Sequence, residues 1–335
     1  MRAFSYASPN KKEEVPALLG KSWGEVEILA GGSDLLALMK DDITTPRRLV
    51  NIKKVAGMHA ISNEKGELHL GALVTLAQIG LASHVRQHHP MLATAAADAA
   101  SPQIRNVATV GGNLCQRPRC WYFRNGFGLL AQKDGKSLVL EGDNRHHAIL
   151  GNDGPAYFVS PSTVAPVLIA YNAKIRLLGP RGAREIPLEK FFVVPKTESE
   201  REHALQPNEF ITEVIVPPAP DVRAAQYEVR QKEAFDWPYA TAAVALTMNG
   251  STVKSARVVL GHVAPIPWVS AEAAQALAGK AVTQATADQA AQAAVAKAKS
   301  LGHNEQKIHL TRVAVKRAIL KAAGSSARAA VARDE

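Results

Sequence analysis

The sequence predicts an α+β fold divided into two parts. In the first part, apolar runs at residues 26–30 and 48–52 have the length of strands, and residues 35–39 between them have helical spacing. This order predicts a β-α-β unit within roughly the first fifty residues. The run Pro-Pro-Ala-Pro that begins at Pro217 is the best candidate for a domain boundary. Beyond it, three expected strands precede three expected helices, an order typical of an α+β domain.

The spacing of apolar residues also predicts the other elements. Strands are expected at residues 4–6, 68–72, 156–159, 173–178, 209–216, 225–230, 240–248 and 253–261. Helices are expected at residues 11–19, 76–84, 91–100, 164–171, 271–277, 285–300 and 308–323. Pro102 is expected to stop the helix before it, residues 181–188 to form a hairpin, and the tail after Gly324 to fray.

Composition and charge narrow the function classes. The chain has 335 residues and 47% of them are hydrophobic, so it can bury an ample core. Its formal net charge of +10 suits an acidic partner or an anionic cofactor. Because the basic residues are scattered and are not interleaved with aromatic ones, a nucleic-acid surface is not indicated.

Targeting signals are not evident in the sequence. Residues 1–21 lack the apolar core of a signal peptide, and no stretch has the length and apolar character of a membrane span. We therefore expect a cytoplasmic protein without membrane insertion. The alternative is a periplasmic location, reached by export together with a partner that carries the signal.

The prediction of function starts from the segment Ile28 to Lys40. An apolar run ends in Gly31 and Gly32, Ser33 and Asp34 follow, and helical spacing begins next. Glycines permit backbone angles that are closed to other residues and let a ligand approach closely. Ser33 or Asp34 is expected to cap the helix, and exposed N–H groups at such a turn suit a phosphate. A lone Gly-Gly pair also fits an ordinary strand-to-helix turn.

A second glycine pair lies in the segment Ser101 to Leu114. Thr109 stands two residues before Gly111 and Gly112, and Asn113 follows them. Two such turns, with hydroxyl and amide side chains beside them, can hold the two phosphates of one dinucleotide, and the N–H groups of both turns are expected to donate. Neither turn matches the G-x-G-x-x-G fingerprint, so a Rossmann site is not indicated.

Together the two segments resemble a known family. Ala30–Leu35 and Thr109–Leu114 closely resemble the corresponding motifs of the FAD-binding medium subunit of the xanthine dehydrogenase / aldehyde oxidoreductase molybdenum hydroxylases. The resemblance covers nearly the whole chain. It is closest to bacterial periplasmic-type aldehyde oxidoreductase flavin subunits, which have an inserted loop that bears cysteines.

The resemblance implies two domains. The first is a two-lobed, PCMH-type FAD-binding domain over residues 1–217, with a small lobe of residues 1–55, a large lobe of residues 56–217 and an inserted loop at residues 115–147. The second is a CO-dehydrogenase-flavoprotein-like C-terminal domain over residues 221–325, which contains a small three-stranded sheet and helices.

The resemblance further implies a FAD-binding electron-transfer subunit. A large partner subunit would hold the molybdenum cofactor and hydroxylate an aldehyde or N-heterocycle, and a small partner subunit would carry [2Fe–2S] clusters. This chain would take electrons singly from those clusters and pass them through FAD to an external acceptor, in a heterotrimer or a dimer of it. Two other classes remain open, namely a self-sufficient flavin oxidase and a nucleotide-binding scaffolding module without redox function.

The inserted loop is the most unusual part of the sequence. Between Cys115 and Arg124 it combines two cysteines, three arginines and three aromatic residues. The residues alone leave open a metal site with His146 or His147, phosphate binding by the arginines, stacking of the aromatics on a ring, and a surface loop held by buried aromatics. In the resembling subunits the loop can carry a four-cysteine iron–sulfur cluster. Because Cys115 and Cys120 are the only cysteines of the chain, we expect the loop without a [4Fe–4S] cluster, with mixed ligation as the alternative.

The glycine segments and the resemblance together predict the cofactor contacts. They are Leu29, Ala30, Gly31, Gly32, Ser33, Asp34, Leu35, Ser101, Thr109, Gly111, Gly112, Asn113, His146, Thr163 and Lys232. Thr163 stands where relatives often place an aspartate. For His146 and Lys232 the alternatives are a structural histidine and a surface lysine. Since the sequence shows no convincing Ser-His-Asp arrangement or carboxylate pair, no catalytic residue and no metal ligand is assigned.

Overall fold

The computed structural model describes residues 1–232 and 235–324, so the tail expected to fray lies outside the described residues. The chain begins with a three-stranded parallel sheet in the order β1 (Ser5–Ala7), β3 (Arg48–Asn51), β2 (Val26–Leu29). Helix α2 (Leu35–Lys40) connects β2 to β3, which confirms the expected β-α-β unit. The single helix expected at residues 11–19 is divided into the 3-10 turn η1 (Lys12–Glu14) and helix α1 (Val15–Leu18).

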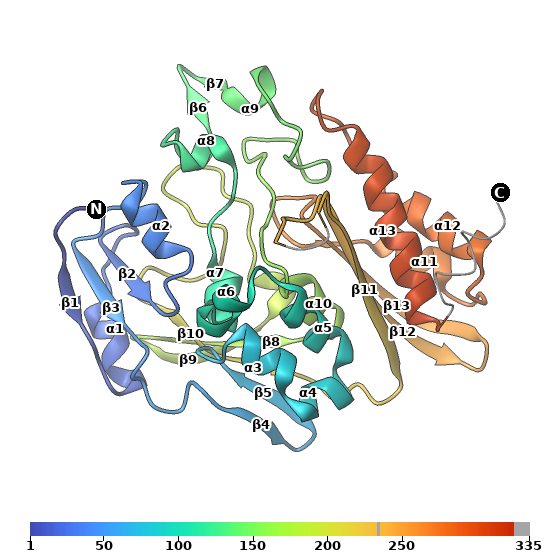
Figure 1. The fold of residues 1–335 in the computed structure, drawn as a ribbon, viewed down its shortest axis with the longest axis horizontal. Helices are drawn as coiled ribbons and strands as arrows, with labels where there is room; N and C mark the ends of the chain where they lie inside the picture. The colour runs from blue at the N-terminus through green and yellow to red at the C-terminus, as the bar shows by residue number, and fades with distance from the viewer. Residues whose placement is uncertain (233–234, 325–335) are drawn as a thin grey trace.

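A second sheet of five antiparallel strands lies beside this unit (Figure 1). Its order is β4 (Ile61–Glu64), β5 (Glu67–Gly71), β10 (Phe210–Val216), β8 (Lys174–Gly179), β9 (Gly182–Pro187). The sequence did not predict β4, because the strand carries a single apolar side chain, that of Ile61. The 3-10 turn η2 (Leu188–Lys190) follows β9.

Short helices gather on one side of the second sheet (Figure 1). They are α3 (Leu76–Leu81), α4 (Ser83–His88), α5 (Pro90–Asp98), α6 (Pro102–Val107), α7 (Val110–Cys115) and α10 (Ala165–Ala170). The single helix expected over residues 76–84 is wrong, because Ala82 takes extended backbone angles (φ −63°, ψ 119°) between α3 and α4. Their apolar faces share one core with the sheet, in which Leu70, Leu92 and Val214 are fully buried.

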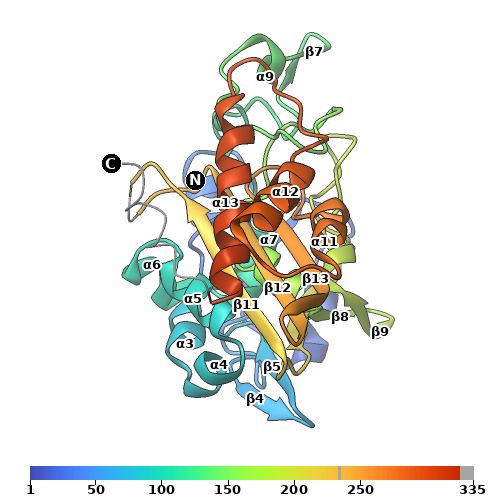
Figure 2. The same cartoon turned by 90° about the vertical axis from the view of Figure 1, so that its right-hand side faces the viewer.

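The third sheet is also antiparallel. Its order is β11 (Val222–Val229), β12 (Ala240–Asn249), β13 (Thr252–Gly261), β14 (Trp268–Val269), so a short fourth strand joins the three that were expected. Helices α11 (Ala271–Leu277), α12 (Gln284–Ala294) and α13 (Gln306–Ala322) cover one face of it (Figure 2). Helix α12 ends six residues before the expected residue 300, and its buried alanines pack into a second core with Val244 and Leu260.

The inserted loop contains little regular structure. It includes α8 (Trp121–Arg124), β6 (Gln132–Lys133), β7 (Lys136–Ser137) and α9 (Leu138–Glu141). Phe123 is buried with Leu129 and Leu130 in a small separate core, whereas Trp121 and Tyr122 are only partly buried. Residues 156–159 are not the expected strand; Ala156 and Phe158 are buried in this small core, but the segment has no ladder partner among the described residues. Among the described residues, no helix combines the length and the apolar character that crossing a membrane requires.

Candidate functional site

A cavity of about 500 Å³ lies where the glycine segments meet the inserted loop. Residues between Arg201 and Ile211, together with Arg230 and residues 235–238, also line it. Among the predicted contacts, the wall contains Ala30, Gly31, Gly32, Ser33, Asp34, Leu35, Ser101, Thr109, Gly111, Gly112, Asn113 and Thr163. The fold therefore brings together both glycine segments, which are about seventy residues apart in the sequence.

The first glycine segment passes directly against the end of α6. A Cβ atom on Gly31 would lie 1.9 Å from the carbonyl oxygen of Val107, so only glycine fits there. Gly32 takes a positive φ of +76°, which reverses the chain toward α2. Within the described part of the chain, the N–H groups of residues 32–35 have no hydrogen-bond acceptor. They form a run of free donors in the cavity wall, as a bound anion requires.

The second glycine segment differs from the expectation. Gly111 donates its N–H to the carbonyl oxygen of Ala72 at 3.0 Å, and Gly112 donates to the hydroxyl of Thr109 at 3.1 Å. Asn113 donates its N–H to the carbonyl oxygen of Thr109 at 2.8 Å. The prediction of free N–H donors here is wrong, because both glycines lie inside α7 and their donors are used within the chain.

The two glycines of α7 have separate functions. A Cβ on Gly111 would lie 3.0 Å from the carbonyl oxygen and 3.1 Å from the Cβ of Ala72, so Gly111 allows α7 to approach β5 closely. A Cβ on Gly112 would meet only the hydroxyl of Thr109 within 4 Å, at 3.0 Å. Gly112 therefore keeps part of the cavity open.

Asn113 fixes another part of the cavity wall. Its carboxamide oxygen accepts from the hydroxyl of Ser162 at 2.7 Å, and its amide nitrogen donates to the hydroxyl of Thr163 at 3.2 Å. These bonds tie α7 to the segment before α10. Thr163 thus lies in the cavity wall with its oxygen held by Asn113.

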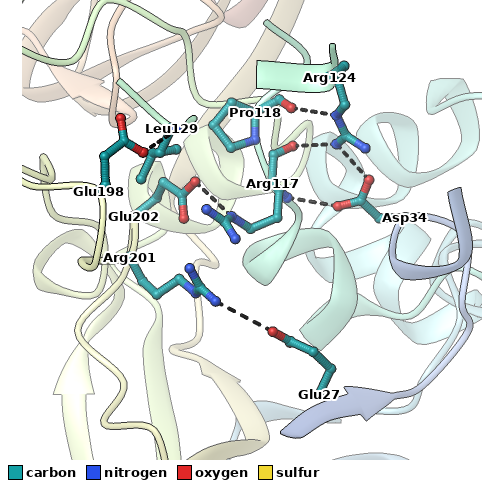
Figure 3. A network of polar contacts seen from close by, with 9 residues as sticks. All are labelled: Glu27, Asp34, Arg117, Pro118, Arg124, Leu129, Glu198, Arg201 and Glu202. Carbon is teal, nitrogen blue, oxygen red and sulfur yellow. Dashed lines mark hydrogen bonds and ion pairs between the residues drawn. The ribbon is translucent and has the colours of Figure 1, made fainter. Parts of the chain in front are cut away.

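Asp34 connects the first glycine segment to the inserted loop, and Figure 3 shows most of this network. Its carboxylate accepts from the backbone N–H of Arg117 at 2.8 Å, from Arg124 Nη2 at 2.8 Å and from Arg119 Nη1 at 2.9 Å. Asp34 occupies the N-cap position of α2, but its side chain makes no cap bond, so the expected capping function is wrong for this residue. Its carboxylate instead neutralises part of an arginine cluster.

The arginines of the inserted loop are site residues that were not among the predicted contacts. The only signal for them was their density between the two cysteines. Arg117 pairs with Glu202 at 2.9 Å, whereas Arg119 lines the cavity with its guanidinium carbon 4.9 Å from the ring centre of Trp237. Burial lowers the pKa of Arg119, and the neighbouring Asp34 carboxylate opposes that shift.

At another part of its wall, the cavity carries a second set of buried groups. Arg201 lies 3.5 Å from Glu27 and stacks over Trp23, 5.1 Å from the ring centre. Burial raises the pKa of Glu27, and burial together with the nearby arginines lowers the pKa of His203 to about 3. Burial also raises the pKa of Cys115 to about 12. At neutral pH this region therefore contains a neutral imidazole and a neutral thiol.

Three predicted contacts lie outside the cavity wall. Leu29 ends β2, and His146 stacks on the ring of Tyr239 with ring centres 5.1 Å apart. Lys232 donates its backbone N–H to Asp236 at 3.1 Å. The geometry therefore gives these three residues no direct place in the wall.

The cysteines do not join a metal-binding group in the described residues. No set of three or more His, Cys, Asp and Glu side chains there is arranged to hold a metal ion. Cys120 instead contacts His147, with 3.2 Å between Sγ and Nε2. Cys115 and Cys120 are both free thiols.

Comparisons with known proteins agree with this geometry. A family model described as the FAD binding domain in molybdopterin dehydrogenase matches residues 2–219, and one described as the CO dehydrogenase flavoprotein C-terminal domain matches residues 225–322. The chain is 33% identical over 276 residues to the aldehyde oxidoreductase FAD-binding subunit PaoB of Escherichia coli, covering 80% of this chain and 84% of that one. It is 29% identical over 293 residues to the carbon monoxide dehydrogenase medium chain of Hydrogenophaga pseudoflava, covering 88% and 86%.

A solved structure shows the same fold. The chain matches one in the structure of carbon monoxide dehydrogenase from Hydrogenophaga pseudoflava that lacks the Mo-pyranopterin moiety, with a TM-score of 0.76 and 28% identity. The match covers 97% of this chain and 98% of the other.

Proposed function

The chain belongs to the FAD-binding medium subunits of the xanthine dehydrogenase, carbon monoxide dehydrogenase and aldehyde oxidoreductase family, and from this membership we propose that its cavity holds one FAD for electron transfer. It is an oxidoreductase subunit. The proposed electron path runs from [2Fe–2S] clusters of a small partner subunit, through this chain, to an external acceptor. When bound, FAD supplies chemistry in steps of one or two electrons.

The free donors of the first glycine segment carry the proposal. Residues 32–35 line the cavity, their N–H groups have no acceptor within the described chain, and a diphosphate would provide acceptors with negative charge. Gly112 leaves the space that a side chain would fill. Asn113 and Thr163 hold polar atoms elsewhere in the wall. The residues of the cavity therefore fit a dinucleotide.

The relatives support the rest of the proposed assembly. The carbon monoxide dehydrogenase relative is a medium chain, which supports a large partner with the molybdenum cofactor and a small partner with the clusters. The name of PaoB supports an aldehyde as substrate, which would bind on the large partner. The two family models support our division into domains of residues 1–217 and 221–325.

The inserted loop is proposed to act without a [4Fe–4S] cluster. The chain has only two cysteines, and Cys120 is in contact with His147. The loop is instead held to the cofactor site through Asp34, which accepts from three of its residues.

The proposal is tested by a visible absorption spectrum, acid release of the cofactor and an iron assay on one sample of the purified chain. The expected result is bound FAD without iron, and reduction of that FAD by aldehyde only when both partners are present. Iron together with flavin would refute the loss of the cluster. Turnover by the isolated chain would favour a self-sufficient oxidase, and failure to bind added FAD would leave a scaffolding module.

A further inference from the structure

Arg119 combines two features that no other arginine of the inserted loop combines in the described residues. Its guanidinium bonds the carboxylate of Asp34, which belongs to the first glycine segment, and the residue lines the cavity. Arg124 bonds the same Asp34 oxygen at 2.8 Å but does not line the cavity. Arg117 lines the cavity, but its side chain pairs with Glu202.

The guanidinium of Arg119 has donors left over. It donates from Nη1 to Asp34 at 2.9 Å and from Nη2 to Gln116 at 3.1 Å, and its buried Nε has no partner among the described residues. An arginine carries five N–H donors, so about two on the Nη atoms remain available besides that of the buried Nε. The face of Trp237 holds the guanidinium plane in place.

The charge balance of the site requires a cation at this position. The first glycine segment carries the carboxylate of Asp34 next to its free N–H groups, and a carboxylate alone would repel a diphosphate held there. Arg119 and Arg124 both neutralise Asp34. Only Arg119 does so from within the cavity wall.

Resting on the proposed function, we propose that Arg119 is a cofactor-binding residue that donates to the diphosphate, whereas Arg124 acts on the site only by positioning Asp34. The sequence left phosphate binding by the loop arginines as an open alternative for all three. The geometry assigns it to one of them.

The experiment uses the full chain stripped of flavin and measures dissociation constants of FAD by fluorescence quenching, at low and at high salt. ADP serves as a competitor, because it carries the diphosphate without the flavin. The variants are R119Q, R119K and the matched control R124Q. R119Q is expected to lower the affinities for FAD and for ADP by the same factor, about ten- to a hundredfold, because a charge-assisted hydrogen bond is lost.

Two further readouts separate binding from a structural effect. R119Q is expected to bind FAD with a shallower salt dependence than wild type, and R119K to recover part of the affinity. R124Q is expected to keep the salt dependence of FAD binding. Because Arg124 acts only through Asp34, the affinities for FAD and ADP should fall less than about threefold.

Three results would overturn the proposal. The first is an equal loss of affinity in R119Q and R124Q, and the second is an unchanged affinity in R119Q. The third is an R119Q variant that binds FAD more weakly but ADP as tightly as wild type, which would place Arg119 at the flavin. If R119Q does not fold, the comparison of R119K with R124Q decides in the same way. Failure of the wild-type chain to bind FAD would refute the proposed function instead.

Discussion

The Sγ atom of Cys120 lies 3.2 Å from the Nε2 atom of His147, at the other end of the inserted loop. Burial raises the pKa of Cys120 and lowers the pKa of His147 to about 4. The contact therefore joins a neutral thiol to a neutral imidazole at pH 7. Such a thiol is a poor nucleophile, because the thiolate is the reactive form.

This pair predicts slow thiol chemistry in the folded chain. We expect neither Cys115 nor Cys120 to react with a disulfide reagent at pH 7.5 within minutes, since burial raises the pKa of Cys115 to about 12. Both thiols should react after unfolding in urea. The measurement is a thiol titration before and after unfolding, with C120S showing which thiol reacts. A fast reaction of one thiol in the folded protein would contradict the prediction.

Substitutions at Gly31 and Gly112 are expected to affect different properties, namely the stability of the fold for G31A and the binding of FAD for G112A. G31A is expected to lower the free energy of unfolding by more than about 2 kcal/mol, because its Cβ would lie 1.9 Å from the Val107 oxygen. G112A should leave the stability of the flavin-free chain within about 1 kcal/mol, because its Cβ meets only the Thr109 hydroxyl.

The same two variants are then compared for FAD binding. G112A is expected to bind FAD at least about tenfold more weakly, since the added methyl group occupies cavity space. Urea unfolding and fluorescence titration give the two quantities. Tight FAD binding by a stable G112A chain would show that Gly112 does not face the cofactor.

The sequence predicted the β-α-β unit and the third sheet because their apolar patterns are local. The resemblance of the two glycine segments to a family predicted which segments would share a cavity. It could not predict that the donors of α7 are already used, because the acceptor of Gly111 is the carbonyl of Ala72, about forty residues away. That bond depends on how α7 packs against the end of β5.

Two other differences between prediction and structure depend on contacts with residues far away in the sequence. Ser33 and Asp34 both suit a helix cap, and nothing local shows that Asp34 accepts from three residues of a loop about eighty residues later. The helix expected over residues 76–84 breaks at Ala82, a residue with high helix propensity, so tertiary packing overrides propensity there.

A single negative charge introduced at Asn113 tests whether the proposed diphosphate lies beside this residue. N113D keeps the shape and the acceptor for Ser162 but removes the donor to Thr163 and adds a negative charge at the cavity. We expect the affinity for FAD to fall about tenfold or more, because the charge lies beside the proposed diphosphate. The control T163V breaks the same hydrogen bond without adding charge and should lower the affinity for FAD by about threefold at most. Equal losses in the two variants would place the charge of N113D away from the phosphates.

Lys307 on α13 joins three segments of the chain. Its ammonium is fully buried and donates to the carbonyl oxygens of His146 and His147 at 3.0 Å and of His262 at 2.8 Å. These bonds tie the end of the inserted loop and the end of β13 to the C-terminal helix. Burial nevertheless lowers the pKa of Lys307 from 10.5 to about 7.

The shifted pKa of Lys307 predicts a specific dependence of stability on pH. Between about pH 7 and 10.5 the unfolded chain holds a proton on this residue that the folded chain has lost, so stability rises with pH in that window. Below about pH 7 the cost of burying the charge is present in full. Urea unfolding of wild type and K307M from pH 6 to 10 should therefore show a difference in unfolding free energy that grows by up to about 1.4 kcal/mol per pH unit. His147 and His262 titrate at about 4 and 3, below the window, so they do not produce this slope. Parallel curves for the two proteins would show that Lys307 stays charged, held by its three carbonyl acceptors.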